Sequence, residues 1–294
     1  MSRRRTALAV ALLAAFLGGC AADPPAPSPA PDRPSPSQPP ARPEVVDEVT
    51  RILVLGDSVT LAVNACPADD RICAEASWAT GGAEVDSLAR RVDAQHPGAS
   101  VASLARDGAR LSTALDNLDR VLAEDPELVI VFLGANDACA PSLAEMTEPV
   151  AFRDQLVRLL DALEERSNPR VLVVEVPDLE NVWEQSHRNR KAVRVWGSTP
   201  ACRSLLADAD DTGPTGEARR ARVSERVAEF NAAIRAVCAE RPRCTTDGGA
   251  VHDYPFHSSD LSAIDFFHPS EDGQRVIAEL IWNALADVPP GDAG

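Results

Sequence analysis

The sequence contains a single lysine, Lys191, among 29 basic residues, so nearly all of its positive charge is carried by arginine. Acidic residues are in excess, and the formal net charge is −16. Residues 1–43 hold five Arg and two Asp, so the rest of the chain carries −19. An acidic body of this kind repels nucleic acids and anionic membrane surfaces, which argues against nucleic-acid binding.

Two other patterns are missing, and a third is too short to have its usual meaning. No internal repeat is evident, which favours one domain over a repeat architecture. No Cys-x-x-Cys pair occurs, which argues against a metal site built from cysteines. The apolar run at residues 7–17 is too short to cross a bilayer as a permanent helix.

The N-terminus instead has the pattern of an export signal. Three arginines at residues 3–5 precede the apolar run, and Leu-Gly-Gly-Cys ends at Cys20. A plain signal peptide that is cut elsewhere is the alternative, and the export route stays open. Leu-Gly-Gly-Cys resembles the bacterial lipobox. The resemblance implies removal of residues 1–19 and lipidation of Cys20, which would anchor the protein on the extracytoplasmic side of the cell membrane.

Six cysteines remain besides Cys20, an even number that suggests three disulfides outside the cytoplasm. Six cysteines allow fifteen connectivities. Close spacing favours Cys66–Cys73 and Cys238–Cys244 as local pairs, which leaves Cys139–Cys202 as the long one.

Proline marks the boundary of the folded part. Residues 21–43 contain ten prolines, typical of a semi-extended spacer that cannot form a core. We therefore expect a lipidated cysteine and linker over residues 20–44 and one folded domain over 45–288. Residues 289–294 read as a disordered tail.

Within the domain, apolar strand-like runs alternate with segments of helical period. The expected strands are Ile52–Leu55, Ser100–Leu104, Leu128–Leu133, Val171–Val176 and Arg243–Thr246. The expected helices are Ala83–Gln95, Leu111–Ala123, Val150–Arg166, Arg219–Ala239 and Ser270–Ala286. This alternation predicts an α/β fold, with βαβ units around one parallel sheet of about five strands.

Two segments are harder to interpret. Leu179–Ser198 carries two tryptophans, a histidine and several basic residues, and an ordinary amphipathic helix is the favoured interpretation. A lid or an acyl-binding wall is the alternative, because long segments after sheet strands often determine specificity. Asp208–Gly216 reads as a mobile surface loop.

Ser58 is the candidate nucleophile. It follows the strand Ile52–Leu55 within Gly-Asp-Ser, at the edge where open α/β sheets place their active sites. An ordinary turn is the alternative, because Gly, Asp and Ser all favour turns. The residue two positions later is Thr60, so the Gly-x-Ser-x-Gly elbow of α/β-hydrolases is absent.

A serine nucleophile needs a base, and His268 is the best candidate among the five histidines. It lies three residues after Asp265, just before the last helix, and this spacing lets the carboxylate orient the imidazole. A helix-capping Asp beside an uninvolved His is the alternative. His96 reads as solvated, and His252 and His257 lie in a loop.

Stabilisation of an oxyanion needs donors aimed at the developing charge. Asn136 follows the third predicted strand and offers a side-chain amide, and Gly108 follows the second and offers a backbone N–H. Turn chemistry explains either alone. In a parallel sheet, however, these connections converge with Ser58 on one edge.

Together these blocks resemble the SGNH, or GDSL-type, hydrolase family. Gly-Asp-Ser at residues 56–58 matches the first block, with Val59 in place of the usual Leu. The other three blocks are matched by Gly108, by Gly-Ala-Asn-Asp at residues 134–137, and by Asp-Phe-Phe-His at residues 265–268. The resemblance implies a flavodoxin-like three-layer α/β/α sandwich that hydrolyses esters or thioesters without a cofactor or metal.

The resemblance also implies a role for each matched residue. Ser58 would be the nucleophile and His268 the base, oriented by Asp265, although a backbone carbonyl replaces the Asp in some relatives. The oxyanion donors would be the N–H groups of Ser58 and Gly108 and the Asn136 amide. The secreted bacterial esterase branch, and more faintly phospholipase B-like proteins, are similar around Gly-Ala-Asn-Asp-Ala-Cys.

The sequence therefore predicts a secreted, lipid-anchored esterase or lipase, monomeric, that acts on small-molecule or lipid esters. A carbohydrate esterase that removes acetyl groups from polysaccharide uses the same centre and is the first alternative. A non-catalytic surface-binding lipoprotein is the second, and the joint presence of the four blocks argues against it.

Overall fold

The computed structural model describes residues 42–67 and 71–289. The predicted signal at residues 1–19, Cys20 with most of the linker, and residues 290–294 of the predicted tail lie outside the described residues. Within the described residues, none of the helices combines the length and the apolar character needed to cross a membrane.

A five-stranded sheet with strand order β2-β1-β3-β4-β5 forms the centre of the domain. All four neighbouring pairs are parallel, and in the pairing of β1 with β3, Val54 lies opposite Ile130. This is the flavodoxin-like order, which confirms the predicted fold class. The strands are β1 (Arg51–Gly56), β2 (Ser100–Ser103), β3 (Leu128–Phe132), β4 (Arg170–Val173) and β5 (Cys244–Thr246).

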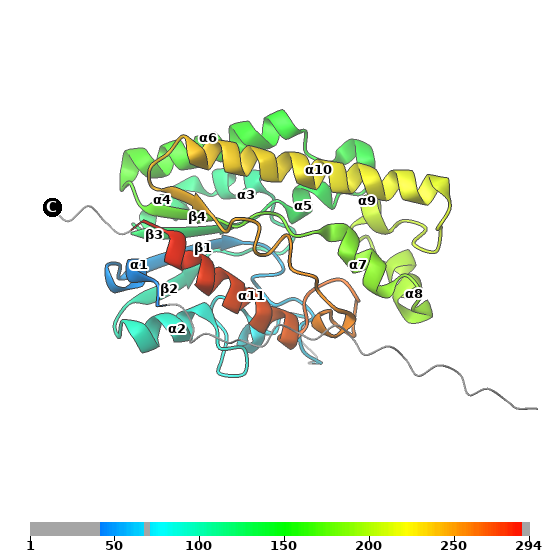
Figure 1. Ribbon diagram of the computed structural model, residues 1–294, viewed down its shortest axis with the longest axis horizontal. Coiled ribbons are helices and arrows are strands. Elements are labelled where there is room, and N and C mark those ends of the chain that lie inside the picture. Colours follow the sequence, from blue (N-terminus) through cyan, green and yellow to red (C-terminus); the bar gives the residue numbers. More distant parts are fainter. Residues whose placement is uncertain (1–41, 68–70, 290–294) are drawn as a thin grey trace, which may run out of the picture. The chain divides into compact units, whose positions relative to one another are not determined.

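Helices cover both faces of the sheet (Figure 1). The α-helices are α1 (Glu44–Asp47), α2 (Leu88–Gln95), α3 (Leu111–Asp116), α4 (Leu118–Ala123), α5 (Ala135–Ala138), α6 (Pro149–Arg166), α7 (Leu179–Ser186), α8 (Arg190–Ser198), α9 (Arg203–Leu206), α10 (Pro214–Ala239) and α11 (Glu271–Ala284). Short 3-10 turns lie at Ala74–Ala76, Leu143–Glu145, Ser258–Asp260 and Leu285–Asp287.

The side chains of alternate strand residues pack into two hydrophobic cores, one on each face of the sheet. Leu53 and Val131 point to the face covered by α3, α4, α6 and α10, whereas Val54 and Ile130 point to the face covered by α1, α2 and α11. Successive side chains of a strand point to opposite sides, so a continuous Val/Ile/Leu run supplies both layers. The sheet is therefore buried on both faces, so the polar side chains of a functional site are expected at the ends of the strands.

Two predicted helices differ from the structure because of local polar contacts. The segment expected to be helical from Ala83 begins its helix only at Leu88, since Asp86 has a φ of +51° and the Ser87 hydroxyl donates to the carbonyl of Gly81. The helix expected over residues 111–123 breaks at Asn117, whose side chain donates to the carbonyl of Thr113.

The segment 179–198 is two helices rather than one. They separate at Asn189, whose side-chain oxygen accepts the N–H of Lys191 and so caps α8. The predicted loop at 208–216 was too long at its C-terminal end, because α10 already begins at Pro214. Proline suits the first turn of a helix, where its missing N–H has no partner to lose.

Three disulfides link the cysteines as Cys66–Cys73, Cys139–Cys202 and Cys238–Cys244. These are the pairs that the spacing of the sequence indicated. Disulfides persist in oxidising environments, so three of them indicate an extracytoplasmic location.

Candidate active site

Ser58 lies in a tight turn directly after β1. Gly56 permits this turn, because a Cβ at that position would lie 2.1 Å from the Thr60 hydroxyl oxygen. The Ser77 hydroxyl donates to the Thr60 carbonyl at 2.7 Å, and the Gln274 amide of α11 donates to the Val59 carbonyl at 2.8 Å. The turn is thus fixed from both sides, and Ser58 is only 6% exposed.

His268 connects Ser58 to a carboxylate. Its Nε2 lies 3.0 Å from the Ser58 Oγ, and its Nδ1 lies 2.6 Å from Oδ2 of Asp265. An ionised carboxylate can only accept, so Nδ1 carries the proton of a neutral imidazole and Nε2 is left to accept the serine hydroxyl. This is the tautomer that a general base requires.

The Asp265 carboxylate is held by the loop that it belongs to. Its Oδ1 accepts the backbone N–H groups of Phe267 and His268, both at 3.0 Å. Burial alone would raise the pKa of Asp265, but the hydrogen bonds from His268 and Asn64, together with the charge that His268 carries when it is protonated, outweigh it and lower that pKa. The indole N–H of Trp196 donates to the Asp265 carbonyl at 3.0 Å, so α8 supports the same loop.

Asn64 is a second partner of this carboxylate. Its amide Nδ2 donates to Oδ2 of Asp265 at 2.6 Å, and its carbonyl accepts the Ser262 hydroxyl at 2.5 Å. Asn64 has a φ of +55°, a left-handed conformation that Asn tolerates better than most residues. The disulfide Cys66–Cys73 begins two residues after Asn64 along the chain.

Asn136 lies on α5, just after β3, where it meets the Ser58 turn. Its Nδ2 donates to Oδ2 of Asp57 at 3.1 Å and to the Ala109 carbonyl at 3.0 Å. The amide therefore joins the turn after β1 to the segment that contains Gly108, which has a φ of +71°. Within the described part of the chain, the backbone N–H groups of Ser58 and Gly108 donate to no other protein atom.

Asp57 is a buried carboxyl at the centre of this junction, with 3% exposure. Its Oδ1 accepts the N–H of Val59 at 2.9 Å, and its Oδ2 accepts the Asn136 amide. Burial disfavours the charged form and raises the pKa of Asp57 to about 6, despite the opposing hydrogen bond from Val59.

Asp137, the residue after Asn136, connects the segment that contains Gly108 to the segment that contains Asn136. Asp137 is fully buried and accepts the Leu111 N–H at 3.0 Å and the Thr147 hydroxyl at 2.7 Å. Burial raises the pKa of Asp137, and these hydrogen bonds oppose that effect. The start of α3 is thereby fixed against α5, which sets the distance between the Gly108 and Asn136 segments.

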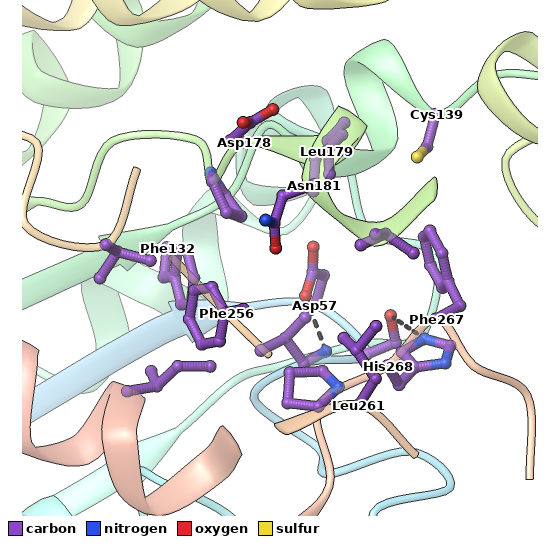
Figure 2. Close-up of a pocket in the computed structure, with 18 of the residues that line it drawn as sticks. Asp57, Phe132, Cys139, Asp178, Leu179, Asn181, Phe256, Leu261, Phe267 and His268 are labelled. Carbon is purple, nitrogen blue, oxygen red and sulfur yellow. Dashed lines mark hydrogen bonds between the residues drawn. The ribbon is translucent and has the colours of Figure 1, made fainter. Parts of the chain in front are cut away.

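A pocket of about 70 Å³ opens beside Ser58 and His268 (Figure 2). Most of its walls are aliphatic or aromatic and come from the end of β3, from α7, from the loop before α11 and from α11 itself. The side chains include Phe132, Leu179, Val182, Val251, Phe256 and Ile277. The pocket can accept a hydrocarbon group next to the serine hydroxyl.

The structure brings Ser58, Asp265 and His268 into one hydrogen-bonded chain and places Asn136 beside them. The other histidines have different partners: His96 contacts the Val46 carbonyl and His252 the Val176 carbonyl. His187 stacks on Trp183, and His257 precedes a 3-10 turn. No group of three or more potential metal ligands occurs among the residues that the structure describes.

Sequence reasoning missed three polar residues of the site. Asp57, Asn64 and Asn181 contact the matched residues or line the pocket. Asp57 was visible as part of Gly-Asp-Ser, but its contact with Asn136 depends on the packing of β1 against β3. No sequence signal identifies Asn64 or Asn181.

Comparison with known proteins identifies both a family and a shared fold. The GDSL-like Lipase/Acylhydrolase family matches residues 54–276. An alpha/beta hydrolase enzyme from the metagenome of Lake Arreo, Spain, aligns with a TM-score of 0.51 and 18% identity, over 80% of this chain and 94% of that one. A catalytic mutant of an acetylxylan esterase from Geobacillus stearothermophilus aligns with a TM-score of 0.51 and 13% identity, over 80% and 93%. No curated protein matches the chain.

Burial of Asp57 predicts a pH-dependent stability. The folded state holds the proton more tightly than the unfolded state, so stability present at low pH is lost as the pH rises through the raised pKa. From roughly pH 5 to pH 8, the wild type should lose about 1.5 kcal/mol of unfolding free energy relative to Asp57→Asn. Urea unfolding of both proteins at each pH measures this difference, and parallel curves would contradict it.

Proposed function

This chain belongs to the GDSL-like lipase/acylhydrolase family and is an ester hydrolase, and we propose that it acts through a covalent acyl group on Ser58. The observation that carries the proposal is the chain of contacts from Ser58 through His268 to Asp265, at 3.0 and 2.6 Å. A serine at hydrogen-bond distance from an oriented imidazole is the arrangement that nucleophilic catalysis requires.

In the proposed reaction, Nε2 of His268 takes the proton of Ser58 while Oγ attacks the ester carbonyl carbon. The imidazolium is stabilised by Asp265, and it returns the proton to the departing alcohol as the ester C–O bond breaks. Water then loses a proton to His268 and attacks the acyl carbon. The acid leaves, and the proton returns to Ser58.

The negative charge on the carbonyl oxygen would be stabilised by three donors. The N–H groups of Ser58 and Gly108 have no protein partner in the described residues, which leaves them available for an oxyanion. The Asn136 amide already donates to Asp57 and to the Ala109 carbonyl. It would therefore share one of these hydrogens with the oxyanion.

The pocket supports an acyl group larger than acetyl. Apolar side chains such as Phe132, Val251 and Phe256 surround the space beside Ser58, and an acetyl group would leave most of this surface uncovered. A carbohydrate acetyl esterase is the second candidate, because an acetylxylan esterase has the same fold. The apolar walls of the pocket favour an esterase or lipase that accepts acyl groups larger than acetyl.

The proposed location follows from the N-terminal sequence and the disulfides. A lipidated Cys20 would hold the protein on the extracytoplasmic side of the membrane, and the ten prolines of residues 21–43 would separate the domain from the lipid surface. In this proposal, the protein is a monomer, needs no cofactor and binds no nucleic acid.

Replacement of the nucleophile tests the mechanism. Ser58→Ala should lower kcat on p-nitrophenyl esters by about a thousandfold or more, because removal of a serine nucleophile has effects of that order. Ser198→Ala, at an exposed serine of α8, is the matched control and should keep full activity.

In the wild type, kcat/KM should rise about fourfold per methylene beyond acetyl until the pocket is full. Highest activity on acetyl would favour the carbohydrate esterase instead.

Asn64 should act as a positioning residue for Asp265. Asn64→Ala removes the 2.6 Å hydrogen bond to the carboxylate, and we expect kcat to fall about tenfold while KM stays unchanged. Asn168→Ala is the matched control, because Asn168 also has a positive φ, +46°, but lies away from the site. A KM effect without a kcat effect, or equal losses in both variants, would refute this role.

The lipid anchor can be tested separately from catalysis. Cys20→Ala should abolish incorporation of labelled fatty acid and move the protein from the membrane fraction to the soluble fraction, because a membrane-bound acyl chain is lost. Esterase activity of the released protein should be unchanged. Unaltered labelling in the variant would exclude Cys20 as the acylated residue.

A further inference from the structure

The pocket beside Ser58 contains a polar side chain without a partner. Asn181 lies on the first turn of α7, and its Oδ1 is buried with no hydrogen-bond donor near it. Its Nδ2 donates to no atom of the described residues. Figure 2 shows the Asn181 amide pointing from α7 towards Asp57, in the interior of the pocket.

The other polar groups of the pocket are already engaged or solvated. Both oxygens of Asp57 accept hydrogen bonds, and both hydrogens of the Asn136 amide are donated. Asp178 accepts the Glu180 N–H as the cap of α7 and is exposed to solvent. Asn181 is thus the amide of the pocket for which neither the oxygen nor the nitrogen has a hydrogen-bond partner among the described residues, and the surrounding walls are mostly apolar.

The helix that carries Asn181 is firmly attached to the domain. Leu179 is buried, and the indole N–H of Trp183 donates to the Ala209 carbonyl at 2.7 Å. The Arg220 guanidinium lies 3.6 Å from the centre of the Trp183 ring. Because α7 is fixed at both ends of its first two turns, Asn181 stays at the pocket wall.

We propose that Asn181 recognises a hydroxyl or amide N–H on the ester substrate, close to the scissile carbonyl, an inference that rests on the proposed function of the site. Buried polar groups in proteins are nearly always hydrogen-bonded, so an unpaired acceptor in an apolar pocket points to a missing partner. A ligand donor supplies that partner. The substrate class is therefore an ester with a hydrocarbon part and a nearby hydrogen-bond donor, such as a hydroxyacyl ester or a monoester of a polyol.

A hydrogen bond from the substrate to Asn181 would make the enzyme select esters that carry such a donor. A substrate that lacks the donor leaves the acceptor unpaired and displaces any water that satisfied it, whereas a substrate with the donor restores the hydrogen bond. We expect a preference in kcat/KM of about tenfold or more for the hydroxylated member of a matched pair.

Two pairs of esters distinguish the acyl side from the alcohol side. The first pair is p-nitrophenyl butyrate and p-nitrophenyl 3-hydroxybutyrate, and the second is ethyl butyrate and 2-hydroxyethyl butyrate. The wild type should prefer the hydroxylated ester in one pair, which identifies the side that carries the donor. Asn181→Leu, of similar size but apolar, should reduce that ratio to about one, whereas Asn181→Asp keeps an acceptor and should keep the preference.

Gln185→Leu is the matched control, because it makes the same amide-to-aliphatic change one turn along α7, outside the pocket. It should keep the wild-type ratio. If Asn181→Leu does not fold, Asn181→Ala takes its place. A wild-type ratio near one in both pairs, or a ratio that survives in Asn181→Leu, overturns the inference while Ser58-dependent hydrolysis still supports the proposed function. Absence of hydrolysis of all four esters overturns both.

Discussion

The carboxylate of Asp265 is the group on which the geometry of the site depends. One oxygen accepts two backbone N–H groups of its own loop, and the other accepts the imidazole of His268 and the amide of Asn64. These contacts fix the position of the carboxylate and favour its charged form, which in turn fixes the tautomer of His268. The contact between Nε2 and Ser58 follows from that tautomer.

A second polar junction connects the turns that leave the sheet. Asn136 bonds to Asp57 after β1 and to Ala109 near the start of α3, and Asp137 bonds to Leu111. Each contact crosses from one strand-end loop to another. In a buried setting such bonds are costly to break, so the loops hold one another in register although none is part of the sheet. The donors proposed for the oxyanion are positioned by this junction.

The sequence was sufficient to predict the parallel sheet and the proximity of Ser58, Asn136, Asp265 and His268, because each of these residues follows an apolar run or precedes the last helix. Parallel strands bring their carboxyl ends to one edge, so position along the chain translates into proximity. The rest depends on tertiary packing. Asn64 meets Asp265 across 201 residues in a left-handed conformation. The break at Asn117 and the late start of α2 come from side-chain contacts that helical periodicity does not encode.

The disulfide between Cys139 and Cys202 encloses the whole segment that includes α7 and α8, the two helices that carry Asn181 and Trp196. One end of this covalent loop lies three residues after Asn136, and the other precedes α9. A protease that cuts the backbone once within the loop therefore releases no fragment. In the proposed extracellular setting, a nicked chain would keep both halves of its pocket together for as long as the sulfur bridge lasts.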